Sequence, residues 1–132
     1  MSYAAAAALQ TAVFQRLNSY AGLTGISVVD AVPPGAGTGT FILLGPETAN
    51  DQSDKTGPGV EHQFQVSVIS DATGFMPAKT AAAAVSTALI DTALSLATGN
   101  LVGLRFVRAT AKRLKEGDSR RIDLIFRARI DF

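Results

Sequence analysis

Two stretches of the chain place apolar residues at the three- and four-residue spacing of an amphipathic helix. The first covers about residues 3–19 and is rich in alanine, the strongest helix former. Its apolar side consists of Leu9, Val13, Phe14 and Leu17. The second lies within residues 77–99, where Pro77 suits the first turn and Gly99 suits the end. We expect its buried side to consist of Val85, Leu89, Ile90, Leu94 and Leu96.

Three segments between these helices have the composition or the alternation of β-strands. They are "ISVVDAV", "TFILLG" and "EHQFQVSVIS", at residues 26–32, 40–45 and 61–70. The second is apolar throughout, which predicts an interior strand that is covered on both faces. In the third, Phe64 and Val66 alternate with Gln63 and Gln65, which predicts one buried face and one polar face.

Residues 46–59, "PETANDQSDKTGPG", separate the second and third strands and have no apolar periodicity. The segment is rich in Pro, Gly, Asn and Asp, the residue types that favour turns. It therefore predicts a long exposed loop, and loops of this length are usually functional or disordered.

The end of the chain predicts a hairpin of two strands, at about residues 102–114 and 119–131, around a short loop at 116–118. The buried face sets the register, because a slip by one residue would turn every apolar residue of a strand to the opposite face. We therefore expect apolar residues to meet on one face, in the pairs Val102–Phe132, Leu104–Ile130 and Phe106–Ala128.

This register has two consequences for the basic residues of the hairpin. The face opposite the apolar one carries Arg105, Arg127 and Arg129. Arg108, Thr110 and Lys112 fall on the apolar face, where a charge would be buried without a partner. We therefore expect the distal part of the hairpin, at residues 108–126, to project past the helices with both faces in water.

The order of these elements predicts an α+β fold in a single domain that covers residues 1–132. We expect a mostly antiparallel sheet of about five strands with two helices packed on one face, in the order α-β-β-β-α-β-β. A chain of 132 residues has the length of one typical domain.

Composition excludes several classes of site. The chain has no cysteine, so it can form neither a disulfide framework nor a thiolate metal site. No apolar run reaches the roughly 18 residues that a transmembrane helix needs, so we expect no membrane partner. Charged residues make up 17% of the chain, below the roughly 25% of typical soluble domains, which favours a surface partly covered by protein partners.

No motif predicts catalysis, a cofactor or a metal ion. "PPGAGTGT" has the spacing G-x-G-x-G and precedes a strand, whereas a dinucleotide-binding loop has G-x-G-x-x-G and opens a helix. His62 is the only histidine and lacks spaced catalytic or metal-binding partners, so we interpret it as a polar residue at a strand edge. The carboxylates of Asp51, Asp54 and Glu61 do not form a specific metal motif.

The formal net charge of +1 hides a strong asymmetry. Residues 105–132 hold nine basic and four acidic residues, a net charge of +5, and the preceding residues hold three basic and seven acidic residues, a net charge of −4. The basic hairpin is compatible with a solvated sheet face, a protein-docking surface or a phosphate-binding surface. We favour protein docking, because arginine is enriched at interfaces and the hairpin lacks interleaved exposed aromatic residues for base stacking.

The predicted partner-docking residues fall in two groups. The tip of the hairpin carries Lys112, Arg113, Lys115, Arg120 and Arg121, and the exposed loop carries Asp51, Asp54 and Lys55. An inter-subunit or channel face is predicted at Arg105, Arg127 and Arg129.

Three segments give the chain a specific resemblance. "VVDAVPPGAGTGTFILLGPE", "VEHQFQVSVIS" and, after a helix, "LVGLRFVRATAKRLKEGDSRRIDLIFRARIDF" occur in this order. Together they resemble the small tail-completion, or tail-terminator, proteins of long-tailed phages, and most closely the branch found in the gene clusters of gene transfer agents. The resemblance covers nearly the whole chain and rests on the "VPP" turn, the strand that ends in "LG" and the arginine-bearing hairpin that closes the chain.

The resemblance implies a structural virion protein without enzymatic activity or cofactor. Such proteins form a hexameric ring that caps the tail tube and joins it to the connector or stopper protein under the head, and DNA passes through the ring without sequence-specific binding. The protein is then assembled in the bacterial cytoplasm into a phage-like particle. Two alternatives stay open at this point, a head–tail connector or stopper and a basic nucleic-acid-binding module.

Overall fold

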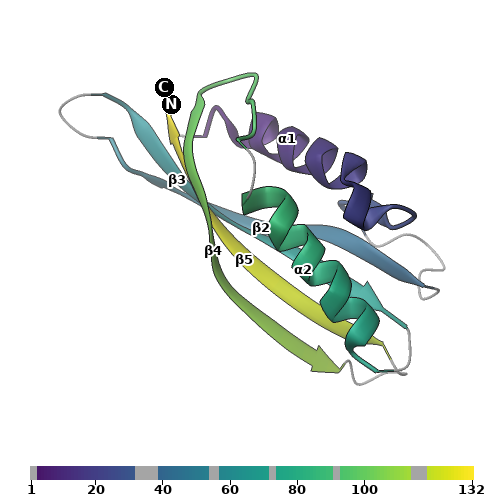
Figure 1. The fold of residues 1–132 in the computed structure, drawn as a ribbon. Helices are drawn as coiled ribbons and strands as arrows, with labels where there is room; N and C mark the ends of the chain where they lie inside the picture. Colours follow the sequence, from purple (N-terminus) through teal and green to yellow (C-terminus); the bar gives the residue numbers. More distant parts are fainter. Residues whose placement is uncertain (1–2, 32–38, 54–56, 72–73, 91–92, 114–118) are drawn as a thin grey trace.

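The computed structural model describes the whole chain except residues 1–2, 32–38, 54–56, 72–73, 91–92 and 114–118. Its elements, in chain order, are α1 (Ala6–Ser19), the short 3-10 helix η1 (Ala21–Leu23), β1 (Ser27–Val29), β2 (Thr40–Asp51), β3 (Gly59–Ser70), α2 (Met76–Ile90), β4 (Asn100–Arg113) and β5 (Arg120–Asp131). Figure 1 shows their arrangement. The predicted α+β class and the order α-β-β-β-α-β-β are confirmed.

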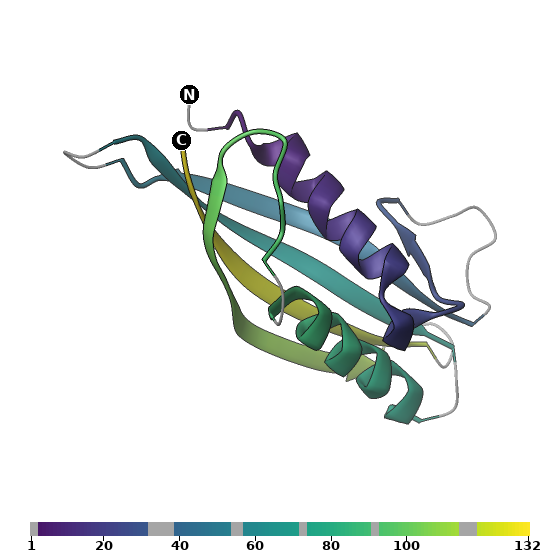
Figure 2. The ribbon, with the colours of Figure 1, turned by 45° about the horizontal axis from the view of Figure 1, so that its top comes forward.

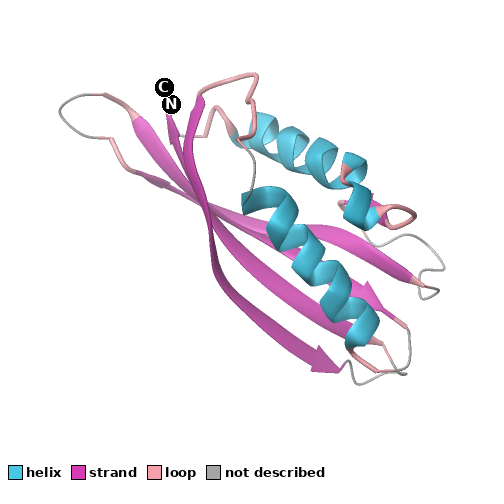
Figure 3. Cartoon of the chain, in the orientation of Figure 1, coloured by secondary structure: helices cyan, strands magenta, loops and turns pink. Residues whose placement is uncertain are grey.

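The five strands form one sheet in the order β1-β2-β3-β5-β4. β1 and β2 run parallel, and the other neighbouring pairs are antiparallel. Both helices lie on the same face, α1 towards the β1–β2 side and α2 over β5 and β4 (Figures 2 and 3). β2 is an interior strand, as predicted, but the described helices cover one of its faces rather than both.

Alternation along β3 and β5 builds the core. Along β5, successive residues are alternately buried and half-buried from end to end, and most of β3 follows the same pattern. Phe126 is fully buried, and its ring stacks on Phe64 with the centroids 5.6 Å apart and meets the edge of Phe106 at 6.0 Å. The helices add the buried residues Leu9, Val13, Leu17, Val85 and Leu89.

α2 ends earlier than predicted, at Ile90, and residues 93–99 contain no helix. Leu94 and Leu96 are partly buried against the core from this irregular segment, and Ile90 is exposed rather than buried. Gly99 does not end a helix. It has a φ of 80°, and a Cβ at this position would lie 2.7 Å from a side chain of β5, so glycine permits the close turn into β4.

The prediction of a loop at residues 46–59 is wrong for its first part. Residues 46–51 continue β2 and pair with the first residues of β3, so the two strands form a long hairpin. A β-bulge at Gly45 and Pro46 interrupts the pairing, which accommodates a residue that cannot donate a ladder hydrogen bond. Residues 54–56 lie outside the described part of the chain.

The predicted register of the β4–β5 hairpin is also wrong. Phe106 pairs with Phe126 rather than with Ala128, a shift of two residues that keeps the predicted faces. Beyond a β-bulge at Val107, Arg108 pairs with Ile125, a shift of one residue that reverses the faces. A second bulge lies between Leu101 and Gly103, so the edge strand is interrupted twice.

The bulge at Val107 removes the conflict in the predicted register. Because the alternation reverses there, Ala109 and Ala111 lie on the side of α2. The residues that lie on the uncovered face instead are Arg108, Thr110 and Lys112.

The distal part of the hairpin, at residues 108–126, therefore does not project past the helices. α2 lies along it, and Ile122 and Leu124 of β5 are buried core residues (Figure 1). Only β4 is exposed here, because it is the edge strand. The tip at residues 114–118 lies outside the described residues.

Deleting Val107 tests the role of the bulge. Without the extra residue, one half of β4 must turn its polar residues towards α2 or detach from β5. We expect the free energy of unfolding to fall by about 2–4 kcal/mol, the cost of burying unpaired polar groups or losing packed edge contacts. Urea unfolding of the purified protein measures this change.

Val107→Ala is the matched control, because it keeps the number of residues in the strand. It removes only methyl groups from a half-buried site, so we expect a loss of less than about 1.5 kcal/mol. Equal effects of the deletion and the substitution would contradict the role of the bulge in setting the faces of β4.

Candidate functional site

The face of the sheet that no described helix covers is lined by alternate residues of β3, β4 and β5. The intervening residues fill the core, so these positions are available for polar side chains. They include Glu61, Gln63, Gln65 and Ser67 of β3, Arg105, Arg108, Thr110 and Lys112 of β4, and Arg121, Asp123, Arg127 and Arg129 of β5. The three arginines that the sequence assigns to one face, Arg105, Arg127 and Arg129, do share it.

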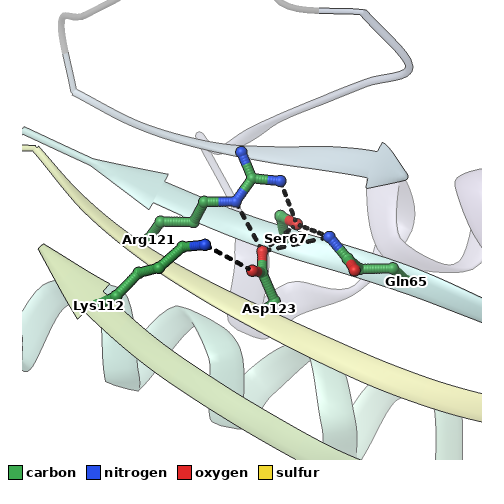
Figure 4. Close-up of polar contacts among 5 residues, drawn as sticks. All are labelled: Gln65, Ser67, Lys112, Arg121 and Asp123. Carbon is green, nitrogen blue, oxygen red and sulfur yellow. Dashed lines mark hydrogen bonds and ion pairs between the residues drawn. The ribbon is translucent and has the colours of Figure 1, made fainter. Parts of the chain in front are cut away.

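Asp123 is the centre of a polar cluster on this face (Figure 4). Its Oδ1 accepts hydrogen bonds from Ser67 Oγ and Arg121 Nε, both at 2.7 Å, and from Gln65 Nε2 at 3.3 Å. Lys112 Nζ lies 3.8 Å from Oδ2 of the same carboxylate. The cluster joins residues of β3, β4 and β5 and compensates the charge of Asp123.

The pKa of Asp123 is held below its ordinary value. Partial burial acts to raise this pKa, but the hydrogen bonds from Ser67 and Arg121 and the charges of Arg121 and Lys112 outweigh it. Asp123 is therefore ionised in the folded protein at neutral pH. Since its pKa is lowered by folding, the stability that it contributes is lost as the pH falls through that lowered pKa.

Two more arginines of β5 are paired with carboxylates. Arg127 Nε lies 3.2 Å from Glu61 Oε1, and its Nη2 donates to Gln63 Oε1 at 3.3 Å. Arg129 Nε donates to Asp131 Oδ1 at 2.8 Å. These partly exposed pairs contribute little to stability, but they neutralise the middle of the uncovered face.

The arginines of the edge strand β4 differ from those of β5. Arg105, Arg108 and Arg113 are exposed, and none of them has a hydrogen bond or an ion pair in the described part of the chain. The uncompensated arginine charge of the described sheet is therefore concentrated on one edge.

The two edges of the sheet are open and carry opposite charges. β4 spans 14 residues, with four basic residues and no acidic one. At the other edge, β1 pairs with Phe41–Leu43 of β2, and from Leu44 onward the described part of β2 has no strand on that side. This part of β2 contains Glu47 and Asp51 and no basic residue. Open edges expose unpaired backbone groups that can pair with another strand.

The predicted docking residues do not all lie on one surface. Lys112 and Arg113 are exposed at the end of β4. Lys112 shares the cluster of Asp123 with Arg121, whereas Arg113 pairs with Arg120 on the other face. Arg120 is 7% exposed on the helix-covered face, with its guanidinium carbon 5.4 Å from the ring centroid of Phe75, so it is not an exposed docking residue as predicted. The residues that lie outside the described part of the chain are Asp54, Lys55 and Lys115.

Asp51 ends β2 close to the tip of the β2–β3 hairpin. Its Oδ1 accepts hydrogen bonds from the Ser53 hydroxyl at 2.6 Å and the Ser53 backbone amide at 3.3 Å. These hydrogen bonds lower the pKa of Asp51. The residue is therefore an exposed, ionised carboxylate at one end of the sheet.

The sequence analysis missed a polar contact that links buried His62 through Glu47 to the exposed Tyr3. His62 is fully buried on the helix-covered face rather than lying at a strand edge, and its Nδ1 is 2.9 Å from Glu47 Oε2. Tyr3 donates its hydroxyl hydrogen to Glu47 Oε1 at 2.6 Å, and this hydrogen bond raises the pKa of Tyr3. The bulge at Gly45 and Pro46 makes the contact possible, because it turns Glu47 towards the helix-covered face.

The described residues show no alternative type of site. They contain no group of three or more His, Asp or Glu side chains that could hold a metal ion. None of the described helices is long and apolar enough to cross a membrane. Most of the segment "PPGAGTGT" lies outside the described residues, at 32–38.

Asp123→Asn tests the polar cluster. At pH 7 the substitution removes a charge that two cations compensate, so we expect the free energy of unfolding to fall by about 1–3 kcal/mol. Because the pKa of Asp123 is lowered in the folded state, the difference from the unsubstituted protein should shrink as the pH falls below about 4, the ordinary Asp range.

Denaturant unfolding at several pH values measures this difference. Asp131→Asn is the control, because its pair with Arg129 is more exposed, and it should cost less than about 1 kcal/mol. A difference that stays constant down to pH 3 would contradict an electrostatic role of Asp123.

Two comparisons with known proteins found a match. A search of curated proteins found no match. Among solved structures, a chain of the "Virion of native gene transfer agent (GTA) particle" is 56% identical, with a TM-score of 0.89 over 99% of this chain and 100% of that chain. The family model "Tail completion protein gp17" matches residues 11–131. This family is structural, which confirms the predicted absence of enzymatic activity. The chain therefore belongs to the tail completion protein gp17 family.

Proposed function

We propose that this chain is a component of a gene transfer agent particle, in which it forms a ring that terminates the tail tube and joins it to the head connector. The observation that carries the proposal is the 56% identity, over 99% of the chain, to a chain of a gene transfer agent virion. Membership of a tail completion family supports a position at the end of the tail. The resemblance to tail terminators adds a hexameric state and a central channel for DNA.

The open edges of the sheet support closure into a ring. A ring requires a head-to-tail contact between two different surfaces of the subunit, and the basic edge at β4 and the acidic edge at β2 are such a pair. Within one subunit, β4 runs antiparallel to β1 and β2. In a ring whose copies are related by rotation about an axis along the strands, β4 of one copy therefore runs antiparallel to β1 and β2 of the next. Backbone pairing and opposite charge then act together, and each open edge is covered.

The two ends of the sheet support separate contacts to the tube and the connector. Asp51, where β2 ends, lies next to the end of β5, whereas Arg113, where β4 ends, lies next to the end of β3. These two strand ends therefore lie at opposite ends of the sheet (Figure 1). In a ring whose axis follows the strands, one of these ends faces the tail tube and the other faces the head connector.

The uncovered face supports a channel that DNA can cross without being held. Arg127 and Arg129 are paired with carboxylates, so their attraction for phosphate is reduced. Arg105 adds a charge without a partner in the described residues, which favours a weak contact that does not depend on sequence.

The two alternative functions have less support. A connector or stopper lies one ring away from the tail terminator, and the family match names tail completion. A free-standing nucleic-acid-binding module requires uncompensated basic residues across a surface, whereas much of the basic charge on this face is paired.

Removing the protein from particle-producing cells tests the proposed function. We expect filled heads without tails and separate tails of irregular length, because the tube is neither terminated nor joined. Electron microscopy of the particles and counting of gene transfer events measure both effects. Particles with normally joined heads and tails would refute the proposal, and expression of the protein from a plasmid controls for effects on neighbouring genes.

Reversing the charge of the β4 edge tests the head-to-tail contact. The double variant Arg105→Glu/Arg108→Glu should stay folded, since both side chains are exposed and have no partner in the described residues. Glu47 and Asp51 of the next copy lie on the helix-covered face, so the charges act across the edge without direct pairing. Reversing both arginines adds repulsion at this edge, so we expect subunit association to weaken by about 10-fold or more.

Light scattering on the purified protein and recovery of the variant in particles measure the association. Arg105→Lys/Arg108→Lys is the matched control, because it keeps both charges, and it should assemble. Normal assembly of the Glu variant would exclude the β4 edge as a charged contact.

A further inference from the structure

An apolar groove runs between α2 and the edge strand β4. Its floor consists of Ile122 and Leu124. Its walls include small residues, which are Ala83 and Ser86 of α2 and Ala109 and Ala111 of β4, together with the larger side chains of Lys79 and Phe106. The groove has a volume of ≈ 300 Å³ and is open to solvent. It exists because alanine and serine side chains are too short to close the space between the helix and the strand.

The groove lies on the half of the subunit that meets the next copy in the proposed ring. β4 is the strand at that edge, and α2 packs on β3, β5 and β4 beside it (Figure 2). The helix at the opposite edge of the sheet is α1. A head-to-tail contact that pairs β4 with the β1–β2 edge therefore places α1 of one copy beside the α2–β4 groove of the next.

Phe14 is the side chain of α1 that points to this contact. Leu9, Val13 and Leu17 of α1 are buried against the sheet. Thr11 and Gln15 line a hollow with residues 95–98 on one flank. Gln10, one turn before Phe14, lines a cavity with Gly45 and Glu47 of β2, so Phe14 lies on the flank towards that edge. Its side chain is 38% exposed, although an aromatic ring gains from burial.

Phe14 and the groove lie at the same position along the strand direction. Val13 lines a small cavity together with Leu44 of β2. The row of paired residues that begins at Leu44 crosses the sheet through Val66 and Leu124 and ends at Ala109, in the wall of the groove. Phe14 follows Val13 in α1, so it lies level with the groove when the sheets of two copies continue side by side.

We propose that the groove between α2 and β4 receives the Phe14 ring of the neighbouring copy, as the apolar anchor of the ring interface. This inference rests on the proposed ring. The charges of the two edges orient the copies, and the ring fills the space that Ala83, Ala109 and Ala111 leave open.

The other exposed apolar side chains fit the groove less well. Most of them lie on α2, β4 or the end of β5, which is the same half of the subunit as the groove, and these are Met76, Ile90, Val102, Phe106 and Phe132. Tyr3 is on the side of α1, but its hydroxyl is bound to Glu47. The walls of the groove offer few polar groups, which disfavours a polar small molecule.

Photo-cross-linking in assembled particles tests the contact directly. Phe14 is replaced by the photoreactive aromatic amino acid p-benzoylphenylalanine, which keeps a ring at this position, and purified particles are irradiated and digested. We expect the cross-linked peptides to join residue 14 to residues 79–86 or 106–111 of a second copy. The same replacement at Gln15, which is exposed next to Phe14 but on the opposite flank of α1, is the control and should not label the groove.

Two substitutions give an independent measurement. Phe14→Ala removes the ring, and Ala111→Phe fills the groove from within the same copy, so each should weaken subunit association by about 10-fold or more without lowering stability as a core substitution would. Gln15→Ala, on the opposite flank of α1, should leave association unchanged. Unfolding curves check that all three variants are folded.

The outcomes separate this inference from the proposed function. Cross-links to the groove together with weaker association of both variants support it. Joined particles with cross-links only to other surfaces or other proteins, or normal association of Phe14→Ala, would overturn the groove contact while the ring stands. Normally joined particles in cells that lack the protein would overturn the proposed function itself.

Discussion

The alternation of residues along β3 and β5 is the constraint on which the rest of the structure depends. One set of residues must fill the core beneath two helices, with Phe126 fully buried at its centre. The other set is then committed to the uncovered face, where it forms the cluster of Asp123 and the pairs of Arg127 and Arg129. Burial on one face therefore determines which charges are compensated on the other.

The outer strands follow this constraint by means of bulges. At Val107 the bulge keeps Ala109 and Ala111 on the side of α2 and sends the charged residues to water. In β2 the bulge at Gly45 and Pro46 turns Glu47 towards buried His62. Each bulge adds one residue to a strand and changes which side chains meet the core. The register of the edges therefore depends on the central strands, not on the patterns of the edges themselves.

The sequence predicts the helices and strands that have a regular apolar periodicity. It does not predict the segments whose structure depends on pairing with another strand. The order of helices and strands and the alternation of Phe64 and Val66 with glutamines follow from periodicity. Residues 46–51 have no such pattern, because β3 stabilises them as a strand. A bulge leaves no periodic signal, so the predictions for the faces of β4 and the extent of the β2–β3 hairpin are wrong. His62 is different, because it shares the face of Phe64 and Val66 and the alternation of β3 does indicate its burial. Arg120 was misjudged because the helix-covered face that buries it is visible only in the fold.

The composition of β4 and α2 reconciles two opposite demands on an assembling subunit. Before assembly, an edge with large apolar side chains would expose a patch that favours aggregation. After assembly, a contact needs apolar surface and room for a partner side chain. Alanine at positions 83, 109 and 111 exposes little apolar area in the single copy, and it leaves the buried Ile122 and Leu124 as a floor that a larger side chain can reach. The arginines of β4 that have no partner among the described residues protect the same edge from aggregation, so one strand both protects the free subunit and provides a surface for its assembly.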